Sequence, residues 1–304
     1  SSKQRHSSIA LSLSFSKLFS APLSIAAIAL LSSCKVTDIS DEEQSASLAP
    51  YSEHKIKDST LDEHFGGRTA FLIGAESLEI KDHNQISSTE DEDTVEASFT
   101  IRLDPGEHLE VGTAIAIDPR GYFITAGHCI GGQEIYAAYI DHKRESVIEK
   151  VEPIWIRESS YPEVDFALFR VEGKPAQTFD WAETFDIGET AFSSGATVKM
   201  DEEEDPPFQL TTDSFAGELK KTRDVRFQKT KFQLIWHRSP VRKGNSGGPL
   251  VNADGELIGV NYAATSPIKR ATGAEITPMG YAIRPDIDWV RNLIEEDWAK
   301  RQND

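Results

Sequence analysis

Short apolar runs separated by Gly, Pro and Asp recur along most of this chain. Runs of this length with turn-forming residues between them are typical of strands in antiparallel β structure. Residues 114–117 and 122–124 form one such pair, and the Pro119-Arg120-Gly121 turn between them predicts a hairpin. We expect further strands in the segments 68–73, 97–103, 192–198, 231–237, 249–252, 256–262 and 279–283.

The spacing of apolar residues changes near the end of the sequence. In the segment 285–301 apolar side chains recur at helical spacing, which predicts an amphipathic helix. These side chains are Ile287, Val290, Ile294 and Trp298. We therefore predict an all-β chain with one terminal helix packed on it.

The N-terminal segment differs from the rest in charge and hydropathy. Residues 1–33 carry basic residues and no acidic ones, and the stretch 18–31 is apolar, as in a secretion signal. The end of this segment, Leu31-Ser32-Ser33-Cys34, resembles a bacterial lipobox, in which small residues precede a cysteine that is acylated. A transmembrane anchor is the alternative, but the stretch is short for a bilayer and contains Ser and Pro.

We therefore expect a lipoprotein signal peptide over 1–33, with Cys34 as the lipidation site and as the anchor to a membrane. The polar segment 34–66 is predicted to be a flexible tether that begins with the acylated cysteine. The expected location is the bacterial cell envelope, with the outer membrane favoured over the inner because Lys35 follows the cysteine. A soluble periplasmic or secreted protein is the alternative.

Acidic residues outnumber basic ones. The 304 residues include 50 Asp and Glu against 32 Lys and Arg, a formal net charge of −18. Nucleic acid is therefore not an expected partner, because binding the phosphate backbone requires basic surface. We interpret acidic clusters such as 90–93 and 201–205 as solvated loops, with attraction of basic substrates or cations as the alternative.

Three short motifs carry candidate chemistry. The hexapeptide 244–249 sets Ser246 among glycines, and such a backbone can aim the N–H groups of Gly244 and Ser246 at one oxyanion. The glycines after the serine should leave room for a substrate backbone. A serine nucleophile needs a base, and His128 follows the predicted hairpin. Asp165 precedes an apolar segment, where a buried carboxylate would need a partner such as an imidazole N–H.

Each motif alone is compatible with a turn, a structural histidine or a cap, but together they favour a Ser-His-Asp triad. In this order they resemble the trypsin-like (chymotrypsin-fold) serine peptidases. The resemblance implies two six-stranded antiparallel β-barrels, at about 67–180 and 181–284 of a domain spanning 67–304, followed by the helix over 285–301. It implies a serine endopeptidase acting on protein or peptide substrates, with no cofactor and no metal.

Carried over residue by residue, the resemblance makes His128 the general base and acid, Asp165 the carboxylate that orients it, and Ser246 the nucleophile of an acyl-enzyme. Gly244 and Ser246 supply the oxyanion donors. Asn245 replaces the aspartate of the animal digestive enzymes, so the chain resembles the bacterial HtrA-like and glutamyl-endopeptidase branches more closely. The alternative function is a catalytically inactive lipoprotein that keeps this fold as a binding or scaffold module.

The resemblance also implies a specificity pocket lined by Pro240, Asn261 and Ala263. The pocket-floor aspartate of trypsin would fall at Pro240, so cleavage after Lys or Arg is not supported. Cys129, beside the candidate base, is expected to be a small buried side chain and a free thiol if Cys34 carries lipid. A disulfide between these two cysteines is the alternative.

Overall fold

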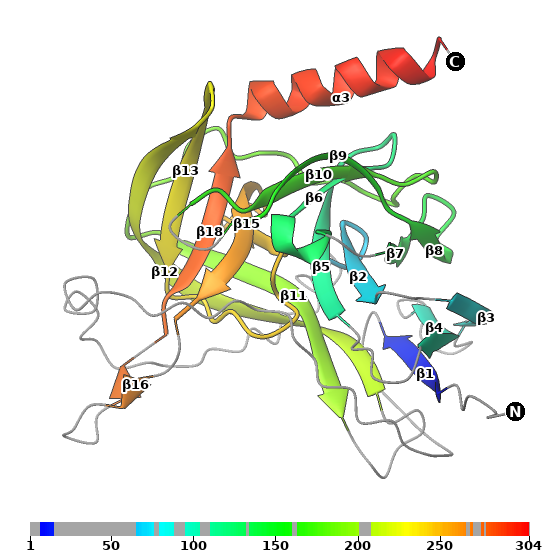
Figure 1. Ribbon diagram of the computed structural model, residues 1–304. Helices are drawn as coiled ribbons and strands as arrows, with labels where there is room; N and C mark the ends of the chain where they lie inside the picture. The colour runs from blue at the N-terminus through cyan, green and yellow to red at the C-terminus, as the bar shows by residue number, and fades with distance from the viewer. Residues whose placement is uncertain are drawn as a thin grey trace, which may run out of the picture.

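Two large curled β-sheets and one C-terminal helix make up the described part of the protein (Figure 1). The helix, α3 (Ile287–Arg301), lies on the outside of the sheets, directly after the last long strand. The predicted all-β class and terminal helix are therefore confirmed. The computed structural model describes residues 7–14, 65–75, 79–87, 95–103, 110–131, 134–159, 163–200, 208–265, 268–269, 275–276 and 278–303.

The first sheet has seven antiparallel strands in the order β8-β7-β2-β5-β6-β10-β9. Its central strands β6 and β10 are buried on both faces, which explains why their sequences are continuous apolar runs. The predicted hairpin is confirmed, with Ile115 opposite Ile124. The strands are β2 (Thr69–Ala75), β5 (Glu110–Asp118), β6 (Tyr122–Thr125), β7 (Glu134–Ile140), β8 (Ser146–Lys150), β9 (Glu152–Arg157) and β10 (Phe166–Arg170).

The second sheet has nine strands in the order β11-β14-β15-β18-β13-β12-β1-β4-β3. An additional pairing between β11 and β12 closes the first six strands into a ring, the second barrel that the sequence predicts. A separate two-stranded ribbon joins β16 (Ile268–Lys269) to β17 (Glu275–Ile276). The nine strands are β1 (Ser7–Ser14), β3 (Glu79–Ser87), β4 (Val95–Leu103), β11 (Thr190–Met200), β12 (Phe208–Phe227), β13 (Thr230–His237), β14 (Pro249–Val251), β15 (Leu257–Ala264) and β18 (Gly280–Pro285).

One predicted strand belongs to the nine-stranded sheet and not to the first barrel, where we expected it. The segment 97–103 is a strand, as expected, but its partners are β1 and β3, so its assignment to the first barrel is wrong. A strand's own sequence gives its propensity but not its partner. Strand β1 links this hairpin to β12 in a parallel pairing. Removal of residues 1–33 as a signal peptide would take β1 out of the sheet and separate the β3–β4 hairpin from β12.

Helix α3 holds the two sheets together through aromatic packing. Asp286 caps its first turn by accepting a hydrogen bond from the backbone N–H of Trp289 at 3.0 Å. The Trp289 ring then lies 5.0 Å from Trp155 on β9 and 5.5 Å from Phe232 on β13, measured between ring centroids. One side chain thus contacts both sheets.

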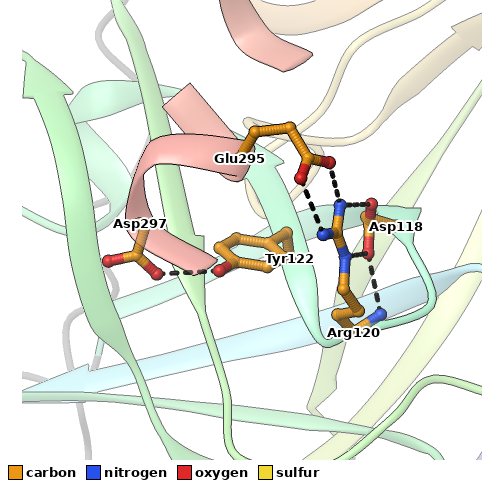
Figure 2. A network of polar contacts seen from close by, with 5 residues as sticks. All are labelled: Asp118, Arg120, Tyr122, Glu295 and Asp297. Atoms are coloured by element: carbon orange, nitrogen blue, oxygen red, sulfur yellow. Dashed lines mark hydrogen bonds and ion pairs between the residues drawn. The ribbon is translucent and has the colours of Figure 1, made fainter. Parts of the chain in front are cut away.

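Polar contacts fix the rest of the helix against the first sheet (Figure 2). Arg120, in the turn between β5 and β6, donates to Glu295 at 2.7 Å and to Asp118 at 2.8 Å. The hydroxyl of Tyr122 donates to Asp297 at 2.8 Å. These contacts attach the helix to the hairpin whose second strand leads to the candidate base.

Candidate active site

The hairpin of β5 and β6 delivers His128. Strand β6 ends at Thr125, and the short 3-10 helix η1 (Gly127–Cys129) follows it directly. Gly127 lets η1 approach its surroundings closely, since a Cβ at this position would lie 2.1 Å from the carbonyl oxygen of Arg157 and 2.9 Å from the Asp165 carboxylate. The glycine before the histidine is therefore required chiefly by the Arg157 carbonyl group and also by the Asp165 carboxylate.

Asp165 reaches His128 because their strands are neighbours. Strand β10 pairs with β6 so that Ala167 lies opposite Thr125, which puts Asp165 and His128 at the same end of the sheet. Oδ2 of Asp165 lies 2.6 Å from Nδ1 of His128, and Oδ1 accepts the backbone N–H of His128 at 2.9 Å. The carboxylate is 1% exposed, so these contacts replace the water that it has lost.

The surroundings of His128 shift its pKa in opposing directions. Burial has the largest influence and lowers the pKa, whereas Cys129 and the Asp165 carboxylate raise it. The net result is a pKa above the ordinary value of 6.5. The other ring nitrogen, Nε2, is buried and has no hydrogen-bond partner in the described part of the chain. His128 therefore has one nitrogen fixed by a carboxylate and one that remains available for proton transfer.

The loop that carries Ser246 comes from the second sheet and touches the first. The carbonyl oxygen of Ser246 accepts the backbone N–H of Thr113 at 2.8 Å and lies 3.5 Å from Sγ of Cys129. Cys129 is the residue after His128, so these contacts place the backbone of Ser246 beside the residue that follows the candidate base. Within the described residues no hydrogen bond joins the Ser246 hydroxyl to Nε2 of His128. Ser246 itself is fully buried. Cys129 is buried and is a free thiol, as expected.

Two glycines give the Ser246 loop its shape. Gly244 and Gly247 have φ values of +92° and +84°, a region that favours glycine. A Cβ on Gly247 would lie 2.0 Å from the carbonyl oxygen of Thr113, and one on Gly248 would lie 2.1 Å from that of Ser194. The expectation that these glycines leave room for a substrate is therefore wrong, because the protein's own backbone fills the space.

The Asn245 side chain holds the same loop from inside. It is 2% exposed, accepts the backbone N–H of Arg242 at 2.6 Å and donates to the carbonyl oxygen of Ala196 at 3.2 Å. The amide thus ties the loop to β11 without any charged partner. Gly244 is also buried, and within the described residues its N–H has no acceptor.

The residues predicted to line a specificity pocket lie around this loop. Asn261, on β15, exchanges two backbone hydrogen bonds with it, from Gly247 N to Asn261 O at 2.6 Å and from Asn261 N to Gly248 O at 2.8 Å. Ala263 follows on the same strand and is buried. Pro240 is half-buried, and its carbonyl oxygen accepts the Ser193 hydroxyl at 3.0 Å.

Two residues of this region were not predicted from the sequence. Thr113 donates through its hydroxyl to the carbonyl oxygen of Gly244 at 2.7 Å, and that hydroxyl accepts the N–H of Ala196 at 2.8 Å. The small residues Gly112 and Thr113, before an apolar run, are the signal that could have indicated such a close approach. The second residue, His237, ends a largely apolar strand and is fully buried.

The predicted lipidation site, Cys34, lies outside the described residues, as do the signal peptide apart from β1 and almost all of the tether. Among the described helices, none combines the length and the apolar character that crossing a membrane requires.

Comparisons with known proteins identify the class of protein to which this domain belongs. Residues 112–260 match the family described as trypsin-like peptidase domain. Over 158 residues the chain is 25% identical to a probable periplasmic serine endoprotease DegP-like of Marinomonas, covering 51% of this chain and 30% of the relative. Over 155 residues it is 24% identical to the mitochondrial serine protease HTRA2 of Bos taurus, covering 49% and 31%.

Two solved structures are similar to this chain over part of its length. One is an HtrA-type protease with a tripeptide, with a TM-score of 0.45, 18% identity, and coverage of 76% of this chain and 60% of that one. Another is Deg5, with a TM-score of 0.43, 16% identity, and coverage of 67% and 83%.

Residues 112–260 therefore belong to the trypsin-like serine peptidase family. The chain spans about a third of the length of the curated relatives that it matches, 30% and 31% of the two named here.

Proposed function

We propose that the protein is a serine endopeptidase that hydrolyses peptide bonds through a Ser246-His128-Asp165 triad. His128 Nε2 takes the proton of the Ser246 hydroxyl as its oxygen attacks the scissile carbonyl carbon. The resulting tetrahedral oxyanion collapses to an acyl-enzyme, and the leaving amine departs with the proton returned by His128. A water molecule then gives a proton to the same nitrogen as it attacks the acyl carbon, the bond to the Ser246 oxygen breaks, and His128 returns the proton to that oxygen.

The contact between His128 and Asp165 carries this proposal. A carboxylate that is 1% exposed and lies 2.6 Å from Nδ1 fixes the imidazole with Nε2 as the nitrogen that accepts a proton. It also stabilises the imidazolium that forms during the reaction. The close approach of the Ser246 loop to Cys129 supports the assignment of the nucleophile.

The oxyanion donors in this proposal are the N–H groups of Gly244 and Ser246. The positive φ of Gly244 supports this role, since it turns a peptide plane in a way that other residues avoid. So does the lack of an acceptor for its N–H among the described residues, which leaves this donor available to an oxyanion.

Labelling of the nucleophile tests the proposal. A fluorophosphonate probe should label the purified chain at Ser246, and Ser246→Ala should abolish that labelling. Ser159→Ala, a serine just after β9 of the first sheet, serves as the matched control and should label normally. Absence of labelling in the wild-type chain would contradict catalysis and favour the non-catalytic binding module.

We further propose that the substrates are proteins or peptides of the bacterial cell envelope, where the protein is anchored by lipid on Cys34. The DegP-like relative of Marinomonas is described as probably periplasmic, which supports this compartment. The outer membrane is favoured over the inner, and a soluble periplasmic form is the alternative. In cells that process lipoproteins, wild-type chain should fractionate with membranes and its mature N-terminal peptide should carry diacylglycerol. Cys34→Ala should block this processing, and recovery of soluble chain with unmodified Cys34 would overturn the anchor.

A further inference from the structure

The Thr113 hydroxyl, on β5, makes two hydrogen bonds to the second sheet. It donates to the carbonyl oxygen of Gly244 at 2.7 Å and accepts the backbone N–H of Ala196 at 2.8 Å. A hydroxyl has one hydrogen, and a backbone N–H can only donate, so that hydrogen points to Gly244. Because Thr113 is 2% exposed, water cannot readily replace either partner. The direction and the partners of this hydroxyl are therefore fixed.

The backbone of Thr113 is held as firmly as its side chain. Its N–H donates to the carbonyl oxygen of Ser246 at 2.8 Å, and its carbonyl oxygen accepts the Thr125 hydroxyl at 2.7 Å. Phe71 on β2 lies opposite it in the sheet. Thr125 ends the strand that leads to His128. The sheet that carries the proposed base thus determines the position of the Thr113 hydroxyl.

The carbonyl group of Gly244 belongs to a peptide group between the two proposed oxyanion donors. These donors are the N–H groups of Gly244 and Ser246, and the peptide group from Gly244 to Asn245 lies between them in the chain. Thr113 holds its carbonyl oxygen, and its N–H donates to the carbonyl oxygen of Arg242 at 3.0 Å. A peptide group is planar, so contacts at both ends prevent its rotation. Without them, the wide range of dihedral angles open to glycine would allow the two donors to lose their alignment.

We propose that Thr113 is a positioning residue for the oxyanion hole, whose hydroxyl keeps the N–H groups of Gly244 and Ser246 aligned on one oxyanion. This inference rests on the proposed function, because it assigns a role in that same reaction. Thr113 acts through the backbone of the nucleophile loop and not on the substrate itself. Donors that are aligned in advance stabilise the charge that develops in the transition state. Loss of the hydroxyl should therefore slow the reaction and leave the binding that precedes it unchanged.

A purely structural role is the alternative, because Thr113 also joins the two sheets. Such a role predicts that loss of the hydroxyl lowers the fraction of folded chain and leaves the reaction rate of each folded molecule unchanged. A positioning role predicts folded molecules that react slowly. Thr113→Val separates the two roles, since valine has nearly the shape of threonine but neither donates nor accepts a side-chain hydrogen bond.

A fluorophosphonate probe measures the rate without a known substrate. The Ser246 oxygen bonds to phosphorus, its proton passes to His128, and the bond between phosphorus and fluorine breaks with release of fluoride. Negative charge develops on the phosphoryl oxygen in the transition state, where the proposed oxyanion donors would receive it. The maximum labelling rate therefore reports the alignment of the donors. The probe concentration that gives half of this rate reports the binding that precedes reaction.

Removal of an oxyanion donor typically lowers a rate about 100- to 1000-fold, and misalignment should have a smaller effect. We expect Thr113→Val to lower the maximum labelling rate about 10- to 100-fold, with the half-saturating concentration within about threefold of wild type. Thr113→Ser keeps the hydroxyl and should label within about threefold of the wild-type rate. Thr69→Val is the matched control and should also label normally. The buried Thr69 hydroxyl donates to the carbonyl oxygen of Phe65 at 3.0 Å, and so not to the nucleophile loop.

Circular dichroism establishes that each variant is folded, and rates are compared for folded chain. If Thr113→Val does not fold, Thr113→Ala and Thr113→Ser provide the same comparison, since they differ by the hydroxyl alone. Equal rates in wild type and Thr113→Val, or an equal loss in Thr113→Ser or Thr69→Val, would overturn this inference. Labelling of Ser246 in the wild type would leave the proposed function intact in each of these cases. Absence of labelling in the wild type would overturn both proposals.

Discussion

Asp165 binds His128 through both of its carboxylate oxygens, one at the ring and one at the backbone. The ring contact fixes the tautomer, and the backbone contact fixes the position of the residue that bears the ring. Because Asp165 directly precedes β10 and His128 follows β6, the register of these two strands determines the geometry of the pair.

We expect Asp165→Asn to lower kcat/KM at neutral pH by about 10³- to 10⁴-fold, because an amide cannot hold the same tautomer. In the wild type, His128 accepts a proton only when it is unprotonated, so kcat/KM should rise with pH through a pKa above 6.5, which burial lowers but Cys129 and Asp165 together raise by more. Loss of the negative charge should lower that pKa and move the rising limb to lower pH. Peptide hydrolysis from about pH 5 to 10 measures both effects. A flat wild-type profile between about pH 5 and 8, or an unshifted limb in the variant, would argue against this assignment.

We expect the chain to cleave peptides without prior proteolytic activation. The Asn245 amide already ties the nucleophile loop to Arg242 and Ala196, so no new N-terminal ammonium is needed to order it. Activity should be present in chain that mass spectrometry finds uncut between residues 35 and 68. Activity that appears only after cleavage near residues 65–68 would refute this expectation.

Gly247→Ala should lower kcat/KM at least about 100-fold, because a Cβ 2.0 Å from Thr113 and Thr125 must displace the nucleophile loop. Gly188→Ala is the matched control, since Gly188 also has a positive φ, +98°, but no atom lies within 4 Å of its Cβ position. Any cost common to the two variants comes from backbone strain, and the difference measures the steric clash. Equal activity in both variants would show that the close packing of Gly247 is unimportant.

Trp289→Ala should destabilise the fold by about 3 kcal/mol, because this ring packs on aromatic side chains of both sheets. Glu295→Gln, on the same helix, should cost less than about 1 kcal/mol, since the Glu295 side chain is 65% exposed where it pairs with Arg120. Urea unfolding of the two variants measures both values. A larger effect of Glu295→Gln would mean that polar contacts, and not aromatic packing, hold the helix.

The sequence predicted the structure correctly where the local pattern of apolar and turn-forming residues determines it. The hairpin before His128, the position of Asp165 at the start of a strand, and the terminal helix were all predicted from apolar runs and turn residues. These features depend on nearby residues, so a single sequence contains them.

Several features that depend on distant residues were not predicted. Strand β12 has 20 residues in which charged and polar side chains interrupt the apolar ones, and its pairing with β11 and β13 compensates for that composition. The partners of β4 were assigned wrongly for the same reason. Thr113 and His237 were missed because their contacts join residues far apart in the sequence: the Thr113 hydroxyl bonds to Gly244, and Asn261 lies beside His237.

Thr113 gives the molecule a particular vulnerability. Its backbone and hydroxyl, both on the first sheet, hold Ser246 and Gly244 of the second, while His128 and Asp165 belong to the first alone. Any ligand that separated the two sheets would therefore move Ser246 away from His128 and Asp165, while the hydrogen bonds within each sheet remained intact. Inactivation of this protein need not require unfolding, and a small separation of its halves would be sufficient.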